Sequence, residues 1–205
     1  MSAPEPAYVL PIVEGHGDAA AVPVLIHRIW RDLLKLEGTL VVLPPIREKR
    51  ASFPVADKLR RPLELAASKL AQAGPGRKLI LVMFDADDDC IRDLSASVRM
   101  TCQTYVGHMN FKCVIANPMF ETWIVAGAET LQQHLDLSDG DVPDGVEAER
   151  CRKWWIQHRM PSRRTYSETI DQPKLVRHID LAGAQRRSRS FERLVNVLRC
   201  FAAVT

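Results

Sequence analysis

The chain lacks most of the short motifs that identify enzyme and cofactor sites. Its five cysteines, at positions 90, 102, 113, 151 and 200, form no CxxC pair and no zinc-ligand spacing. It contains no GxxxxGK(S/T) phosphate loop, no HExxH motif and no GxSxG nucleophile elbow. Gly15-His16-Gly17 also falls short of the GxGxxG dinucleotide fingerprint. These absences argue against a P-loop ATPase, a zincin protease, an α/β-hydrolase and a dinucleotide-binding enzyme.

Long apolar runs are also absent. No run approaches the roughly 20 residues of a membrane span. The first six residues lack the basic start and apolar core of a signal peptide. We therefore expect a cytoplasmic chain with no membrane partner, whose cysteines are reduced and mostly buried thiols. Its 205 residues suffice for one α/β domain with a helical appendage, or for two small domains.

Charge is distributed unevenly along the chain. The formal net charge is only +3, but residues 150–205 carry 13 Lys and Arg against 4 Asp and Glu. An acidic site on one part and a basic surface on the other suits an enzyme that holds a metal and binds a polyanion. On charge alone, basic helices that simply face solvent are the commoner explanation.

The most informative stretch is Leu79–Asp89, in which six apolar residues are followed by four aspartates in five positions. A short apolar run bounded by polar residues is typical of a strand buried on both faces. Asp85 and Asp87 then lie at its carboxyl end, where open α/β sheets bind their ligands. Closely spaced carboxylates repel, and a hard cation such as Mg²⁺ relieves that repulsion. The alternative is a solvated loop in which Asp88 or Asp89 caps the next helix.

Apolar runs and helical periodicity alternate over the first 116 residues. This alternation predicts a doubly wound parallel sheet of four strands flanked by helices. The expected strands are Tyr8–Val13, Thr39–Leu43, Leu79–Phe84 and Phe111–Ala116, and the expected helices are about 18–36, 55–73 and 89–107. Residues 44–54 are expected to form a proline-bounded basic loop.

Further helices are expected after the last strand. Asn117 is a good N-cap and Pro118 suits a first helical position, which places Glu121 in the first turn. A second helix is expected over about 146–158, with one of the adjacent Trp154 and Trp155 packed and the other near the surface. A final helix is expected from Ser190 to about Ala203.

Acidic residues follow several of the predicted strands. Because the carboxyl ends of parallel strands share one edge, we expect these side chains to converge there. Such a cluster suits one or two Mg²⁺ or Mn²⁺ ions that assist phosphodiester cleavage. His16 lies in the first loop, where a lone histidine is more often a polar surface group than a catalytic one. The converging acids are Glu14, Asp18, Asp85, Asp87, Asp88, Asp89 and Glu121.

Val13-Glu14-Gly15-His16-Gly17-Asp18 after a strand, with Asp85-Ala86-Asp87 after a later one, resembles the Toprim domain. That domain occurs in topoisomerases, primases, RNA maturases and OLD (overcoming lysogenisation defect) nucleases. The spacing of Glu14 and Asp18 resembles the OLD branch. The closer similarity is to small bacterial Toprim-like proteins of largely unknown function, and it extends to 45–66, 117–126 and 188–194.

The resemblance implies a Toprim-like catalytic core over 1–128 and a basic helical extension over 129–205 that packs on it. It implies Asp85 and Asp87 as metal ligands, Glu14 as a ligand or general acid/base, and Asp18 as a further ligand. The small family usually has Glu at position 18, so the shorter Asp18 leaves a second metal position open. Asp89, Glu121 and Lys174 are candidate accessory residues.

The leading hypothesis is a metal-dependent Toprim nuclease or nickase that acts on DNA or RNA. The resemblance also implies a role in phage defence with a separate ATPase partner, and a homodimer as one state to test. One alternative is a non-catalytic module that binds a partner ATPase or nucleic acid, and another is a small-phosphoester hydrolase. The candidate phosphate contacts, besides Lys174, are Arg47, Lys49, Arg50, Arg163, Arg164, Arg186, Arg187 and Arg189.

Overall fold

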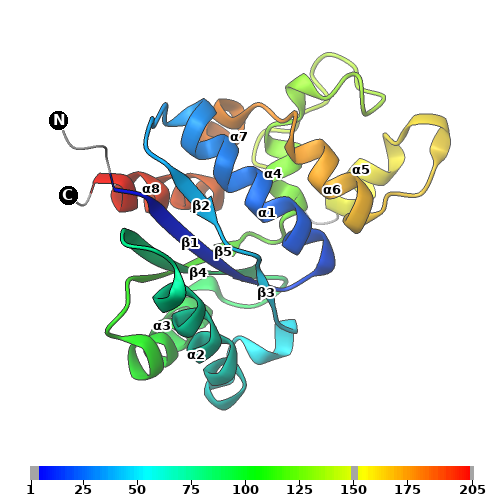
Figure 1. Ribbon diagram of the computed structural model, residues 1–205. Helices are drawn as coiled ribbons and strands as arrows, with labels where there is room; N and C mark the ends of the chain where they lie inside the picture. The colour runs from blue at the N-terminus through cyan, green and yellow to red at the C-terminus, as the bar shows by residue number, and fades with distance from the viewer. Residues whose placement is uncertain (1–4, 149–151, 204–205) are drawn as a thin grey trace.

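Five parallel strands form the centre of the computed structural model, which describes residues 5–148 and 152–203 (Figure 1). The sheet order is β2-β1-β4-β5, and β3 pairs with the end of β1. The predicted parallel α/β sheet is confirmed, with one more strand than expected. The strands are β1 (Ala7–Val13), β2 (Leu40–Val42), β3 (Ile46–Arg47), β4 (Arg77–Asp85) and β5 (Phe111–Ala116).

Strand β4 lies inside the sheet, between β1 and β5. Its apolar residues 79–84 are all buried. Because side chains alternate along a strand, Leu81 enters the core on one face and Val82 the core on the other. The prediction of a central strand buried on both faces is therefore confirmed.

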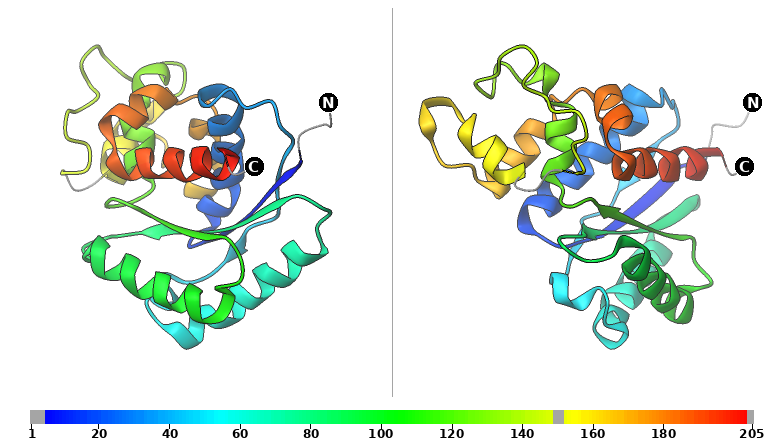
Figure 2. Two further views of the ribbon diagram at one scale, coloured as in Figure 1. Left: turned by 90° about the vertical axis from the view of Figure 1, so that its left-hand side faces the viewer. Right: turned by 180° about the vertical axis from the view of Figure 1, so that it is seen from behind.

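Two layers of helices cover the two faces of the sheet (Figures 1 and 2). Helices α2 (Ala56–Gln72) and α3 (Ile91–Val106) cover one face, where Phe53 stacks on Phe84 with ring centroids 4.4 Å apart. The apolar periodicity of α2 and α3 predicts this one-sided packing. The other face is covered by α1 (His16–Arg28), α4 (Glu121–Ala126), α6 (Glu168–Val176), α7 (Leu181–Arg187) and α8 (Arg189–Ala203).

Short helical segments complete the chain. Helix α5 (Arg152–His158) packs on α4. A π-helical turn continues α1, and three 3-10 turns lie in loops. These four turns are η1 (Ile29–Leu33), η2 (Arg50–Ser52), η3 (Ala128–Thr130) and η4 (Pro161–Arg163).

The C-terminal helices share a hydrophobic core with the sheet. Leu175 of α6 and Phe191 of α8 belong to the same buried cluster as Val13 of β1. Trp123 of α4 lies between the rings of Phe120 and Phe191, at centroid distances of 5.1 and 5.7 Å. Residues after 128 therefore pack directly on the face that α1 covers, and α6 lies beside α1.

The expected start of the helix after β5 is wrong. Asn117 does not cap it: the Asn117–Pro118 peptide bond is cis, and α4 begins at Glu121 with Phe120 as its N-cap. The intervening backbone contacts the loop after β4 instead. The amide of Asp87 donates to the carbonyl of Pro118, and the amide of Phe120 donates to the Asp85 carboxylate. The prediction that Glu121 lies in the first turn is confirmed.

Other boundaries also differ from expectation. The helix expected over 18–36 ends as α1 at Arg28 and continues as the π-helical turn, and the loop expected over 44–54 contains β3. The helix expected over 146–158 is helical only from Arg152 among the described residues, since 149–151 lie outside them. Helices α6 and α7 were not predicted, because Pro173 interrupts the pattern of α6 and α7 has only seven residues.

Two side-chain predictions can be checked directly. Trp155 is 7% exposed and Trp154 is 59% exposed, so one tryptophan packs and the other faces solvent, as expected. Cys102 and Cys113 are free and buried, but Cys90 and Cys200 are exposed, so the prediction of mostly buried thiols holds for only two of these four. Cys151 lies outside the described residues. Within the described part of the chain, no helix is both long and apolar enough to cross a membrane.

Candidate functional site: an acidic edge of the sheet

Two neighbouring strands end in acidic residues at the same edge of the sheet. Strand β1 is followed by Glu14, and β4 ends at Asp85. The parallel register aligns Ile12 with Val82, so both strands leave the sheet on one side. The Glu14 carboxylate accepts a hydrogen bond from the Asp85 backbone N–H at 3.4 Å. The predicted convergence of these two acids is therefore observed.

Asp85 is the most electrostatically perturbed acid of this edge. Its Oδ1 accepts a hydrogen bond from the Phe120 N–H at 2.9 Å. Burial raises the pKa of this carboxyl well above its ordinary value of 3.8, and the nearby charges of Asp18, Glu121, Glu14 and Asp87 raise it further. Carboxylates at four other positions are thus close enough to raise the pKa of Asp85 by charge repulsion.

Asp18 lies in the first turn of α1 and is held by two donors. Its carboxylate accepts hydrogen bonds from the Gly15 N–H at 3.0 Å and from Gln172 Nε2 of α6 at 2.9 Å. Burial raises its pKa, although both hydrogen bonds lower it. Burial likewise raises the pKa of Glu14, with a smaller contribution from Asp87. All three acids resist ionisation because they are partly desolvated together.

A glycine allows α6 to approach the start of α1. A Cβ atom on Gly17 would lie 1.9 Å from Gln172 Oε1 and 2.9 Å from the Glu168 carbonyl oxygen. Any residue with a Cβ atom at this position would force α6 or Gln172 to move. Gly17 therefore permits a close approach of the two backbones, and this approach brings Gln172 to Asp18.

The loop after β4 is held by one arginine. Arg50 lies within 3.4 Å of Asp87 and 2.6 Å of Asp89, and it donates to the Ala86 carbonyl at 3.2 Å. Its guanidinium carbon also lies 5.2 Å from the centre of the Phe84 ring. Asp87 has a backbone φ of +53°, which Asp and Asn tolerate better than most residues. Asp88 is exposed in the same loop.

Glu121 extends the acidic edge into a buried polar network. It is 2% exposed, and it accepts a hydrogen bond from the Tyr166 hydroxyl at 3.3 Å. Lys153 lies 4.0 Å from Glu121 and 2.6 Å from Glu168. Burial raises the pKa of Glu121 to about 7, although the positive charge of Lys153 opposes this shift. Burial and neighbouring acids also raise the pKa of Tyr166.

The sequence did not single out Lys153, Tyr166 or Gln172. All three come from α5, α6 or the chain between them. No local motif marks them, since they reach the acidic edge only through the packing of α5 and α6 on α4 and α1. A small cavity of about 10 Å³, close to the size of one water molecule, is lined by Asp18, Asp85 and Trp123.

The donor chemistry of this edge suits a divalent metal ion. Carboxylate oxygens are the ligands that Mg²⁺ and Mn²⁺ prefer. Within residues 5–148 and 152–203, no three His, Cys, Asp or Glu side chains are gathered closely enough to hold an ion. Glu14, Asp18 and Asp85 each accept a backbone N–H instead. An ion therefore fits by ligand type but needs these side chains to turn away from the N–H groups.

Most of the predicted phosphate contacts lie apart from one another. Arg47 contacts His16, Lys49 is exposed, and Arg50 is engaged by the acidic loop. Arg163 is exposed in the turn η4, and Lys174 is exposed on α6.

Other basic residues of this group have acidic partners. Arg164 makes a two-pronged ion pair with Asp171 at 2.9 and 2.6 Å, and Arg187 pairs with Glu129. Arg186 lies 3.9 Å from Asp180, and Arg189 is exposed at the start of α8. The role of these nine residues in binding stays a prediction.

The fold and this edge together define a class: a parallel α/β domain that gathers acidic side chains where its strands end. The chain belongs to the family described as a domain of unknown function, DUF4276, whose model matches residues 13–199. The match begins at the last residue of β1 and includes β2 to β5 and most of the C-terminal helices.

Two other comparisons add little. The chain is similar to the solved C-terminal region of the Burkholderia pseudomallei OLD protein, with a TM-score of 0.39 and 11% identity over 96% of this chain and 98% of that one. No curated protein matches the chain.

Proposed function

We propose that this chain is a metal-dependent nuclease or nickase that cleaves nucleic-acid phosphodiesters. The observation that supports the proposal is the crowding of acids around Asp85: the Glu14 carboxylate, which follows β1, lies 3.4 Å from its backbone N–H, and its pKa is raised first by burial and then by Asp18, Glu121, Glu14 and Asp87. Such a concentration of negative charge destabilises a fold, so it favours a site that takes a positively charged ligand. The proposed ion is Mg²⁺ or Mn²⁺, as one or two ions, with Glu14, Asp18, Asp85 and Asp87 as its ligands.

Each residue has a proposed part in the reaction. A bound divalent cation supplies an activated water and neutralises charge on the phosphate. Asp85, the last residue of β4, and Asp87, in the loop that follows, would hold the ion. Glu14, whose pKa is raised, orients the attacking water and accepts its proton. Asp18 is a further ligand that Gln172 positions, and Arg50 fixes the loop that carries Asp87.

Accessory roles and partners belong to the same proposal. Asp89 and Glu121 lie beside the ligand set, and Lys174 is an exposed cation of α6 for phosphate contact. The Toprim resemblance suggests a separate ATPase as partner, work in phage defence and a homodimeric state. These suggestions depend on the sequence similarity alone.

A non-catalytic module is the second candidate, and one observation favours it. Glu14, Asp18 and Asp85 each have a protein donor in place of an ion. An acidic edge satisfied in this way is consistent with a domain that binds a partner ATPase or nucleic acid without cutting it. This candidate predicts that neutralising the acids leaves partner binding intact.

The test is cleavage of supercoiled plasmid, single-stranded DNA and RNA by the full chain with Mg²⁺, Mn²⁺ or EDTA. The variant is Asp85→Asn/Asp87→Asn, because Asn keeps the shape of both side chains and tolerates the positive φ at position 87. We expect metal-dependent cutting that falls by about 100-fold or more in the variant, since an ion contributes several kcal/mol to such reactions.

The matched control is Asp57→Asn/Asp93→Asn, which removes two exposed acids from the first turns of α2 and α3. It should cut as the wild type does. Thermal unfolding adds a readout without turnover: Mg²⁺ should raise the midpoint of the wild type and of the control but not of the Asp85/Asp87 variant. Cutting that survives in that variant would refute the proposed ligands, and no cutting by any chain would favour the binding module.

A further inference from the structure

A groove runs along the open side of β5, between α3 and α8. Strand β5 is the last strand in the sheet order, so one of its sides has no partner strand among the described residues. The groove beside it has a volume of about 640 Å³. A second hollow of about 400 Å³ continues it past Lys112 and shares Arg99 and Arg193 with it. Together they follow most of the length of β5.

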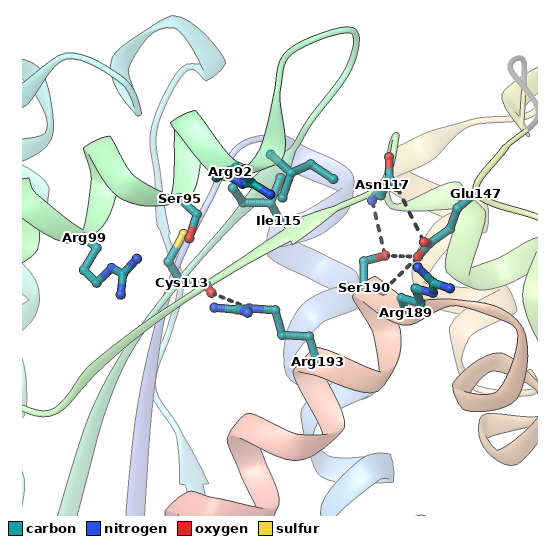
Figure 3. Close-up of a pocket in the computed structure, with 11 residues that line it drawn as sticks. Arg92, Ser95, Arg99, Cys113, Ile115, Asn117, Glu147, Arg189, Ser190 and Arg193 are labelled. Carbon is teal, nitrogen blue, oxygen red and sulfur yellow. Dashed lines mark hydrogen bonds between the residues drawn. The ribbon is translucent and has the colours of Figure 1, made fainter.

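Four arginines line the groove from its two walls. Arg92 and Arg99 of α3 are seven residues apart, two helical turns, so they lie on one face of the helix with Ser95 between them. Arg189 and Arg193 of α8 are one turn apart on the opposite wall. Figure 3 shows Arg99 and Arg193 reaching toward β5 from opposite sides. Burial raises the pKa of the Cys113 thiol on that strand to about 12, and the positive charges of Arg193 and Arg99 oppose this shift.

These arginines have few partners in the protein. In the described part of the chain, the side chains of Arg92, Arg99 and Arg189 make no hydrogen bond or ion pair. The side chain of Arg193 donates only to the Cys113 carbonyl, at 3.4 Å. By contrast, Arg164 and Arg187 are paired with acids. The groove therefore holds positive charge that the fold leaves unneutralised.

The placement of two arginines costs stability. Arg189 is the first residue of α8, and Arg92 is the second residue of α3. A cation at the N-terminus of a helix is opposed by the helix dipole. The dipole of α3 favours an anion near its start, whereas at the start of α8 the Glu147 carboxylate already accepts the Ser190 N–H. Charge and dipole thus point to an anionic ligand in the groove.

One acid, Glu147, lines the main groove, and hydrogen bonds hold its side chain in place. Glu147 accepts hydrogen bonds from the Ser188 hydroxyl at 2.7 Å and from the N–H and hydroxyl of Ser190, both at 2.8 Å (Figure 3). Asn117 Nδ2 lies a further 3.5 Å away. Glu147 therefore fixes the start of α8, and its one negative charge leaves the four arginines of the groove in excess.

The open side of β5 is poorly suited to pairing with another strand. Arg193 occupies the Cys113 carbonyl, and the Asn117 N–H donates to the Ser190 hydroxyl at 3.3 Å. These outward backbone groups are the ones that an added strand would need. Recognition must therefore come from side chains, and guanidinium groups are well matched to phosphate oxygens.

We infer that the groove beside β5 binds the phosphate backbone of a nucleic-acid strand. Phosphate binding follows from the arginines, and an extended strand follows from the hollow that continues past Lys112. The groove also begins next to the acidic edge: Ala116 pairs with Asp85, and Arg92 follows the loop of aspartates. That a strand here leads to a cutting site rests on the proposed function, but phosphate binding does not.

The test is binding of labelled single-stranded DNA and RNA oligonucleotides, followed by fluorescence anisotropy in EDTA. The full chain is compared with Arg92→Ala/Arg99→Ala and with Arg189→Ala/Arg193→Ala. Each pair should weaken binding by about 10-fold or more at low salt, because two charge-assisted contacts are lost. The slope of log affinity against log salt should fall by about 1.4, at roughly 0.7 for each lost phosphate contact.

The matched control is Arg31→Ala/Arg177→Ala, which removes the same charge from exposed positions on η1 and after α6. It should bind like the wild type. Binding by the groove variants equal to that of this control would overturn the inference. So would equal competition by a mononucleotide or by polyglutamate, which would assign the groove to a small nucleotide or to an acidic peptide.

Measuring cleavage and oligonucleotide binding on the same groove variants separates the two proposals. If nothing cuts but the groove variants lose binding, the groove inference stands and the nuclease proposal fails. If the wild type cuts but the groove variants bind and cut normally, the nuclease proposal stands and the groove inference fails.

Discussion

The acidic edge and the groove beside β5 are neighbouring sites that differ in how their charged side chains are buried and paired. At the acidic edge, Asp18, Asp85 and Glu121 are partly or fully buried, and each has a protein hydrogen-bond donor. In the groove, Arg92 and Arg99 are exposed and make no such contact within the described residues. Charge is held inside the fold at one site and left open to solvent at the other.

Because the acids are buried and the arginines are exposed, the two sites should affect the stability of the fold differently. A buried carboxylate is destabilising because it is desolvated and close to other acids, so its protonation is coupled to folding. An exposed guanidinium keeps its water and affects folding little. Substitutions at the acidic edge should therefore change the stability of the fold, whereas substitutions in the groove should change only binding.

The largest stability effect is expected for Glu121→Gln. The pKa of Glu121 is raised from 4.5 to about 7 in the folded chain. Its protonation therefore supports folding fully below pH 4.5, and this support is lost as the pH rises through 7. Gln mimics the protonated form at every pH and can still accept the Tyr166 hydrogen bond. At pH 8 the variant should be more stable by about 3 kcal/mol, at roughly 1.4 kcal/mol for each pKa unit.

Urea unfolding at pH 4 and pH 8 measures this difference. The gain should be near zero at pH 4, and Glu37→Gln, at an exposed position, should show no gain at either pH. A gain independent of pH would show that packing, not ionisation, explains the result. The cost of a buried carboxylate would then not be what distinguishes the acidic edge from the groove beside β5.

A smaller effect, this time a loss of stability, is expected for Gly17→Ala. The added Cβ would lie 1.9 Å from Gln172 Oε1, so α6 or Gln172 must move away from α1. Overpacking of this kind typically costs about 2 kcal/mol. Gly38→Ala is the control, because nothing lies within 4 Å of a Cβ there. Equal midpoints of urea unfolding for the two variants would mean that α6 does not hold Asp18 through this contact.

The two regions were not equally predictable from the sequence. Glu14, Asp85 and Asp87 each directly follow a strand, so local patterns and the geometry of parallel sheets suffice to bring them together. Glu121 was placed correctly in the first turn of α4, although the helix begins later than expected. The donors that hold the acids, such as Gln172, come from a helix with little periodicity and remained hidden.

The groove could not be predicted, for a different reason. Its arginines come from segments about 90 residues apart in the sequence, α3 and α8. They meet only because β5 is at the side of the sheet and the two helices cover its opposite faces. Strand order is a tertiary property that no local pattern encodes. Of the basic residues that the sequence did single out, Arg189 lines the groove, whereas Arg164 and Arg187 are paired with acids.

The smallest effect, and the sharpest contrast, is expected in the groove. Arg92→Ala/Arg99→Ala and Arg189→Ala/Arg193→Ala should change the free energy of unfolding by no more than about 0.5 kcal/mol. Alanine and arginine are both good helix formers, so α3 and α8 should not weaken. Any change should be a gain, because removing Arg92 and Arg189 relieves an unfavourable interaction with the helix dipoles.

Urea unfolding beside the Arg31→Ala/Arg177→Ala control measures this change. A loss of more than about 1 kcal/mol, the size of one lost structural hydrogen bond, would mean that the arginines hold α3 and α8 together. Weaker oligonucleotide binding would then follow from a damaged fold. Unchanged or slightly raised stability together with weakened binding would support the inference, because the arginines would then contribute to ligand binding and not to the packing of α3 and α8.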